Sequence, residues 1–254
     1  MYNPLNYPRL LFLFAFAVLW FATRAGALMR RGREIDPKVL ADFSTILVTT
    51  LTLNGLILGF SFSMAISRYE HRKTYEEAEA NAIGTEYARA DLLPGADGDK
   101  VRSLLREYTA QRVDFYTLTD PEKHLQIVGR IVRLQNDLWA AVVGAAGAQP
   151  TPIIALTVAG MNDVLNSEGY TQAAWWNRIP TGAWALMAAI AITSQLLIGY
   201  GAERAKARGV LYAVLPFVIA IAFMLIADID SPRRGIINVQ PQNLIRLLNS
   251  IKPP

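Results

Sequence analysis

The segment from residue 43 to residue 67 combines an uncharged, apolar run with many hydroxyl side chains. Seven of its residues are spaced three or four apart and therefore share one face of a helix; they are Thr45, Thr49, Thr52, Leu56, Phe60, Ser63 and Ser67. This face is hydroxylated at both ends and apolar in the middle. Several copies of such a helix around an axis would form wet vestibules on either side of an apolar constriction, which can gate by dewetting. The alternative is that small hydroxyl residues only allow membrane helices to pack closely.

Two other features of the membrane segments could carry a function. Gly55 and Gly59 have the GxxxG spacing that usually indicates close helix contact, within or between subunits. Asp228 and Asp230 follow the last apolar segment and are weak candidates for calcium ligands. Calcium needs six or more oxygen ligands, and two carboxylates supply few of them. The alternative, which we favour, is that both aspartates pair with Arg233 and Arg234.

Enzyme chemistry has little support in this sequence. There is no cysteine, only two histidines, and no GxSxG, P-loop, HExxH or GxGxxG motif. We therefore expect neither an enzyme nor a resident cofactor. A cluster of four glutamates, which are Glu76, Glu77, Glu79 and Glu86, is expected to lie on a solvated helix face paired with basic residues, as in the i,i+4 pairs Arg72–Glu76 and Lys73–Glu77.

Composition and hydropathy indicate a membrane protein. The chain has 254 residues, 52% of them hydrophobic and only 18% charged, with a mean hydropathy of +0.23. Four stretches reach the roughly 20 apolar residues that a membrane helix needs, at about 10–29, 43–67, 180–202 and 209–228. The first of them could also be a cleaved signal peptide, but we expect a membrane helix. A fifth uncharged stretch, 138–162, contains two glycines and two prolines and is expected to be two helices that meet at a turn.

The predicted fold is an all-α integral membrane protein with a helical extramembrane domain inserted between its second and third membrane helices. Residues 1–67 hold the first two membrane helices, 68–178 the inserted domain, 179–230 the last two, and 231–254 a C-terminal tail. We expect four helices in the domain: one from 68 to about 93, one from near Asp99, one from Asp120-Pro121 and one from Thr151-Pro152.

The charge distribution identifies the lipid bilayer as a partner and excludes nucleic acid. The inserted domain has 12 basic and 15 acidic residues, a net charge of −3, whereas the rest of the chain has 13 basic and 6 acidic residues, a net charge of +7. The basic residues lie in the short segments next to the membrane helices, where they meet lipid headgroups. Counting basic residues on the two sides of the membrane gives a tie, so charge alone does not orient the chain.

Four segments carry a family resemblance. Residues 58–72, LGFSFSMAISRYEHR, resemble the bestrophin family. Residues 79–94 (EANAIGTEYARADLLP), 177–180 (NRIP) and 228–235 (DIDSPRRG) are more similar to a prokaryotic bestrophin-like domain family of unknown function, and the order of elements agrees over about residues 40–250.

The resemblance implies a pentameric ion channel whose second membrane helix lines the pore. Aligning the Leu-Gly-Phe run implies that the neck of the pore is formed by Thr52, Leu56 and Phe60. It also implies that the inserted domain and both termini are cytoplasmic. Arg68 and Arg72 would then lie at the cytoplasmic pore mouth, where they would favour anions, opposed by nearby glutamates. Thr52 replaces a bulky apolar residue, and the acid-rich calcium clasp of animal bestrophins is reduced to two aspartates, which puts calcium gating in doubt.

Two functions therefore remain open. The first is an oligomeric channel for inorganic ions, a pentamer by the resemblance, that crosses the cell (inner) membrane several times. The second is a non-conducting membrane scaffold whose helical domain binds a partner. The sequence does not indicate ion selectivity, because the side chains of the implied neck are uncharged.

Overall fold

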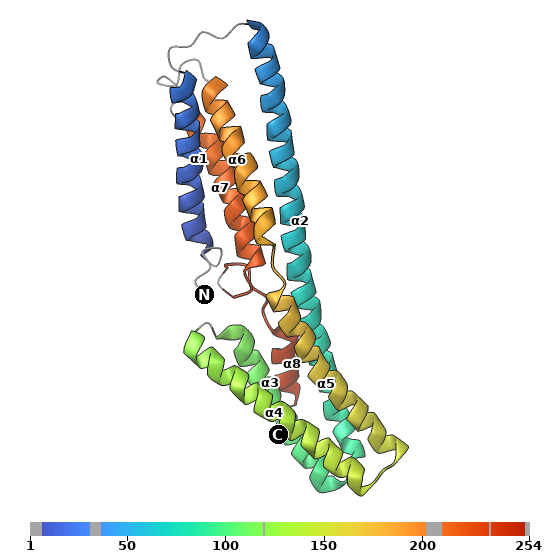
Figure 1. Cartoon of the computed structure of the whole chain (residues 1–254). Helices are drawn as coiled ribbons and strands as arrows, with labels where there is room; N and C mark the ends of the chain where they lie inside the picture. The colour runs from blue at the N-terminus through green and yellow to red at the C-terminus, as the bar shows by residue number, and fades with distance from the viewer. Residues whose placement is uncertain (1–6, 31–36, 119, 202–209, 234, 252–254) are drawn as a thin grey trace. The chain divides into compact units, whose positions relative to one another are not determined.

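The computed structural model describes residues 7–30, 37–118, 120–201, 210–233 and 235–251. Within these ranges all regular structure is helical (Figure 1). The elements are α1 (Pro8–Arg30), α2 (Pro37–Arg89), the short 3₁₀ helix η2 (Ala90–Leu92), α3 (Gly95–Thr117), α4 (Pro121–Ala148), α5 (Pro152–Trp176), α6 (Thr181–Gly201), α7 (Leu211–Asp230) and α8 (Gln242–Ser250). The predicted all-α class is therefore confirmed for the described residues. The segments that connect the first predicted membrane helix to the second, and the third to the fourth, lie largely outside them.

The chain divides into two compact units. Unit 1 contains residues 1–68 and 178–238, and unit 2 contains residues 69–177 and 239–254. Helix α2 belongs to both units, because it continues without a break from its apolar half into its charged half. This agrees with the prediction that the first helix of the inserted domain directly continues the second membrane helix.

Unit 1 contains most of the apolar helix surface of the chain. Four stretches of the described residues are long and apolar enough to cross a membrane, in α1, α2, the α5–α6 region and α7. Helices α1, α6 and α7 lie side by side, as the blue and orange ribbons of Figure 1 show. The four predicted apolar segments thus form helices of membrane-spanning length.

The tightest helix contact of unit 1 joins α1 to α6 through two glycines. A Cβ atom at Gly26 would overlap the backbone carbonyl of Leu196, and one at Gly199 would overlap that of Thr23. Beside this contact, the Thr23 hydroxyl donates a hydrogen bond of 3.0 Å to the side-chain oxygen of Gln195, and both residues are buried. Small residues allow membrane helices to approach closely, and a hydrogen bond between the helices then joins them.

The predicted GxxxG contact in α2 is not made with any residue that the structure describes. A Cβ atom at either Gly55 or Gly59 would meet nothing within 4 Å. Spacing alone could not distinguish these glycines from Gly26 and Gly199, because only the facing helix decides whether a glycine is needed. Of the two options left open for Gly55 and Gly59, contact within the subunit is absent among the described residues.

Unit 2 is a helical domain with its own apolar core. Side chains from α3, α4 and α5 fill it, including Leu105, Tyr108, Leu138 and Met161, each with no exposed surface. Because it buries these side chains between its own helices, the unit has the separate core expected of a domain.

Local capping sets two of the helix starts in unit 2. The Asp120 side chain accepts hydrogen bonds from the backbone N–H groups of the first turn of α4, and Thr151 does the same for α5; a proline follows each cap at the first helical position. Both predicted starts are confirmed. The 138–162 stretch is interrupted between Ala148 and Pro152, as the glycines and prolines predicted, whereas α3 begins at Gly95, four residues before the predicted start near Asp99.

The prediction of a solvated glutamate face on α2 is wrong for three of its four members. Glu76, Glu79 and Glu86 are 1%, 0% and 0% exposed, and only Glu77 faces outward. Lys73 forms its ion pair with Glu70, at 3.9 Å. The periodicity placed these glutamates on common faces of the helix, but it did not show that neighbouring helices cover those faces.

One buried glutamate holds a helix that the sequence did not predict. Glu76 accepts a hydrogen bond of 2.9 Å from the backbone N–H of Leu244 and one of 2.7 Å from the Asn243 side chain. Both donors lie in the first turn of α8, where N–H groups have no partner within the helix. A carboxylate from α2 therefore caps α8, and Leu244 is buried in the core of unit 2.

Candidate functional site

The predicted pore face of α2 is exposed along its whole length in the single chain. All seven of its residues are in the exposed class; they are Thr45, Thr49, Thr52, Leu56, Phe60, Ser63 and Ser67. The two apolar members, Leu56 and Phe60, have 52% and 64% of their surface exposed. The opposite face of the same helix carries the buried residues Asn54, Ser61 and Ala65. The hydroxyl face is therefore not used for packing within the subunit.

The apolar part of α2 is much less covered than that of the other spans. Only 6% of its most apolar window is buried, against 44% for α7. Contiguous apolar surface of this kind is normally covered by lipid or by another protein chain. Because hydroxyl and apolar residues are segregated around α2, its faces differ in what they can meet.

The threonines of this face satisfy their hydroxyl groups within the helix. Thr45, Thr49 and Thr52 each donate to the carbonyl oxygen four residues earlier, at 3.2, 2.8 and 2.9 Å. Each hydroxyl hydrogen therefore already has an acceptor within the helix. Thr52 can therefore sit in a dry environment beside Leu56 and Phe60, which is what the neck implied by the resemblance requires.

The two arginines assigned to the pore mouth are turned towards the protein. Arg72 has only 1% of its surface exposed, in unit 2. The Arg68 side chain is 16% exposed, and its Nη1 lies 3.7 Å from a carboxylate oxygen of Asp230 in unit 1. A mouth position that attracts anions requires exposed charge. The assignment of these residues to the mouth stays a prediction, and the burial of Arg72 gives it no support.

Asp230 ties together three segments of unit 1. Its carboxylate accepts hydrogen bonds of 3.1 and 3.3 Å from the backbone N–H of Ile179, just before α6. Arg178 Nε lies 3.5 Å from it, in addition to Arg68 from α2. Arg68 and Arg178 are therefore partners of this buried charge. Arg68 from within α2 and Arg178 just before α6 are distant from Asp230 in the sequence, and neither was identified from the sequence as its partner. Pairing of the two aspartates with Arg233 and Arg234 stays a prediction, and position 234 lies outside the described residues.

Asp228 organises the chain that leaves α7. Both of its carboxylate oxygens accept from the backbone N–H of Ile236, at 2.8 and 2.9 Å, and one also accepts from Ile237 at 2.8 Å. A Cβ atom at Gly235 would overlap the backbone carbonyl of Asp228 and approach its carboxylate to 2.9 Å. The glycine is therefore needed for the chain to turn back onto this aspartate.

The two aspartates face N–H donors rather than an oxygen-lined cavity. Among the residues that the structure describes, no three histidine, aspartate or glutamate side chains come together as metal ligands. Calcium would have to displace backbone N–H groups or guanidinium groups from these oxygens. Calcium binding by Asp228 and Asp230 stays a prediction, and the donor set here suits a carboxylate bridge rather than a cation.

A buried ionic cluster in unit 2 was not identified from the sequence. Arg112 of α3 donates from Nε and, at 3.1 Å, from Nη2 to the carboxylate of Glu79, and neither side chain has any exposed surface. Thr171 donates a third hydrogen bond to Glu79, at 3.0 Å. Burial by itself lowers the pKa of Arg112, but the Glu79 carboxylate raises it well above its ordinary value. Arg112 Nη1 also lies 3.4 Å from a carboxylate oxygen of Glu168, whose side chain is 21% exposed. Burial raises the pKa of Tyr108 above its ordinary value, so the cluster consists of one arginine between two carboxylates, beside a neutral tyrosine.

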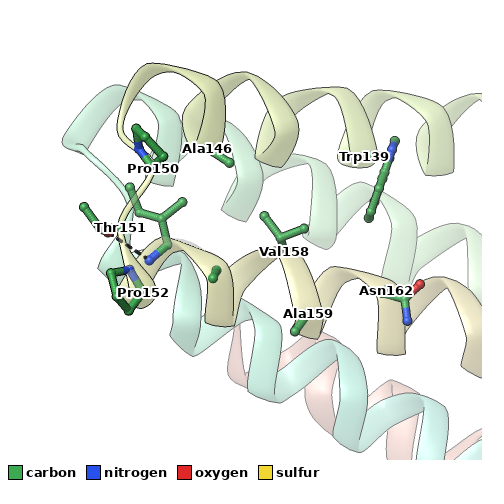
Figure 2. Close-up of a pocket in the computed structure, with 10 residues that line it drawn as sticks. Trp139, Ala146, Pro150, Thr151, Pro152, Val158, Ala159 and Asn162 are labelled. Carbon is green, nitrogen blue, oxygen red and sulfur yellow. Dashed lines mark hydrogen bonds between the residues drawn. The ribbon is translucent and has the colours of Figure 1, made fainter.

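Unit 2 also has an apolar groove of about 780 Å³ between α4 and α5. Figure 2 shows the turn Pro150–Pro152 closing one end of it, with Trp139 from α4 and Asn162 from α5 towards the other end. Val158 points into the space between the two helices, and the dashed line at Thr151 is its capping hydrogen bond to the N–H of Ile154. The groove can accept an apolar group, and it contains no ionisable side chain among its lining residues.

The architecture defines an all-helical membrane protein with two units, and the long helix α2 contributes to each of them. The sequence profile of the Bestrophin-like domain matches residues 9–244. The chain therefore belongs to the bestrophin-like family, as the resemblance in the sequence predicted. A comparison with curated proteins gives no significant match.

Solved structures show the same fold at low sequence identity. A variant of a bacterial bestrophin homolog from Klebsiella pneumoniae aligns with a TM-score of 0.65 and 13% identity, covering 94% of this chain and 96% of the other. A second variant of that homolog gives 0.63 and 12%, with 94% and 93% covered. A structure described only as a membrane protein gives 0.65 and 12%, with 94% and 95% covered. At these identities the likeness concerns the fold.

Proposed function

We propose that this protein is an oligomeric ion channel, with five copies of α2 arranged around a central pore. The hydroxyl face of α2 lines the pore, and Thr52, Leu56 and Phe60 form its neck. Unit 2 lies outside the membrane on the cytoplasmic side, with both termini, and the protein resides in the cell membrane. Inorganic ions are its substrates.

The observation that carries this proposal is the exposure of the hydroxyl face in a single chain. A membrane helix that packs inside its own subunit buries its small polar residues against neighbouring helices. Here all seven residues of the face are exposed, whereas the opposite face carries the buried residues Asn54, Ser61 and Ala65. Assembly around an axis gives this face an aqueous surface to line, and Leu56 and Phe60 then form an apolar constriction.

Family membership supports the same reading. The bestrophin-like family includes ion channels, and the profile match spans nearly the whole chain. The uncovered apolar surface of α2 and the unused Gly55 and Gly59 are consistent with contacts between copies. A symmetric homo-oligomer is the common way to cover such a surface.

The test is ion flux through purified protein in liposomes, with potassium and chloride gradients applied separately. We expect flux of at least one ion from the native protein. Leu56→Ala and Phe60→Ala are expected to change that flux several-fold while the protein keeps its oligomeric mass, because each widens the constriction.

Val48→Ala is the matched control. The exposed fraction of Val48, 62%, is close to the 64% of Phe60. Val48 lies eight residues from Leu56, however, and therefore points about a quarter of a turn away from the centre of the pore face. It should leave the flux unchanged. Equal effects of all three substitutions, or destabilisation by the two neck substitutions without altered flux, would show that the face serves packing.

A non-conducting scaffold is the second candidate, and the groove between α4 and α5 is the observation that favours it. Such a protein would use Trp139 and the surrounding apolar side chains to bind a partner, and α2 would serve only as an anchor. It predicts no flux of either ion and a monomeric or dimeric mass in mild detergent. Pentameric mass together with flux would exclude it.

Orientation can be tested directly because the sequence contains no cysteine. Glu77 is exposed in unit 2, so Glu77→Cys introduces a single thiol there. In intact cells we expect a membrane-impermeant maleimide to leave this thiol unlabelled until the membrane is opened. Labelling without permeabilisation would place unit 2 outside the cell.

A further inference from the structure

Glu86 is a buried carboxyl group without a hydrogen-bond partner. It lies near the end of α2 in unit 2 and has no exposed surface. Neither of its two carboxyl oxygens has a hydrogen-bond partner among the described residues. This distinguishes it from Glu76, which caps α8, and from Glu79, which is paired with Arg112. Burying an unpaired carboxylate costs free energy, and such a group usually binds a proton instead.

Helix α5 has a glycine where it meets this carboxyl group. Gly160 of α5 faces it, and a Cβ atom at that position would overlap both Glu86 Oε2 and Arg89 Nη1. One turn earlier on α5, the buried Thr157 hydroxyl also lacks a partner. Two unsatisfied polar groups thus lie on facing helices, next to Gly160, which has no side chain.

The charges near the carboxyl group neutralise it only in part. Arg89 from α2 reaches the contact, but its guanidinium donates to the carbonyl oxygen of Leu156, at 3.4 Å. In the part of the chain that the structure describes, no ion pair within 4.0 Å joins Arg89 to Glu86. Asp163 from α5 is the other charged group that acts on the site, and it has the same sign as an ionised Glu86.

We propose that Glu86 is a proton-binding site at which the packing of α2 against α5 is linked to pH. With the proton bound, the neutral carboxyl group fits the close contact at Gly160. When the proton leaves, an unpaired negative charge is buried between the two helices and favours their separation. This inference does not depend on ion conduction, since it concerns only the contacts within unit 2.

The electrostatic environment agrees with this geometry. The pKa of Glu86 is raised from its ordinary value of 4.5 to about 8; burial raises it most, Arg89 lowers it in part, and Asp163 also raises it. When the helices separate, the carboxyl group reaches water and its pKa returns towards 4.5. Between these two values, opening releases a proton, so the equilibrium constant for opening rises with pH by up to tenfold per pH unit. Above about pH 8 both forms are ionised and the dependence ends.

The proton itself can be observed by infrared spectroscopy of the full-length protein in detergent. At about pH 7 ordinary carboxyl groups are ionised, so we expect a C=O stretching band from one protonated acid that disappears as the pH passes about 8. Glu86→Gln should remove this band at every pH. The matched control, Glu77→Gln on the exposed side of the same helix, should retain it. A native protein without the band at neutral pH would overturn the proposal.

The link to packing is tested by amide hydrogen exchange, corrected for the intrinsic pH dependence of exchange. Between about pH 6 and pH 7.5 we expect the opening constant of residues 80–92 and 153–165 to rise by up to tenfold per pH unit in the native protein and in Glu77→Gln. It should be independent of pH in Glu86→Gln, whose amide resembles the protonated acid. If Glu86→Gln does not fold, the slope in the native protein still decides, because a flat profile there contradicts the linkage.

Discussion

Replacing Arg112 tests whether the buried ion pair of unit 2 is held as the structure shows. In Arg112→Met the side chain keeps most of its volume but loses its charge. Glu79 would then remain buried, with the Thr171 hydroxyl as its remaining donor. We expect the free energy of opening of unit 2 to fall by about 3–5 kcal/mol, the usual cost of removing one partner from a buried ion pair.

The magnitude follows mainly from the charge that is left behind. Arg112 also lies 4.5 Å above the centre of the Phe115 ring, and loss of this buried contact adds about 2 kcal/mol. The larger part is the desolvation of an unpaired Glu79 carboxylate. If this is correct, removing both charges in Glu79→Leu with Arg112→Met should restore most of the stability, because an apolar pair of similar volume avoids the desolvation of either ion.

Amide hydrogen exchange in α3 measures these changes in the full-length protein, since the slowest amides report the opening of the unit that contains them. The coupling between the two substitutions should amount to at least about 2 kcal/mol. A single substitution that costs less than about 1 kcal/mol, or a double variant no more stable than the single one, would refute the reasoning.

Two further predictions concern unit 1. Gly199→Val should lower the midpoint of thermal unfolding in detergent by several degrees, because a Cβ atom there overlaps the Thr23 carbonyl. The control Gly55→Val should not destabilise the isolated subunit. Equal shifts of the midpoint in the two variants would contradict the assigned contact. Asp228→Ala should speed amide exchange at Ile236 and Ile237 by the loss of about 1–3 kcal/mol, since their N–H groups lose their acceptor. In the native protein, added calcium should leave the same amides unchanged, and a calcium-dependent slowing would restore the two aspartates as metal ligands.

Much of the fold could be predicted from the sequence because its signals are local. Four apolar segments of membrane-spanning length, the caps at Asp120 and Thr151, and the break between residues 148 and 152 depend only on neighbouring residues, and the structure has all of them. The hydroxyl face of α2 also follows from spacing alone, since the helix period fixes which residues share a face.

What the sequence could not decide is which faces another helix covers. Glu77 and Glu79 lie two positions apart on one helix, yet one is exposed and the other is buried against Arg112. Gly55 and Gly199 look equally suited to close contact, yet only Gly199 meets a backbone. In each case the free energy depends on a partner that is distant in the sequence. The local sequence therefore determined the helices and their faces, and the tertiary structure decided which charges are buried, which glycines are needed and where Glu86 has no partner.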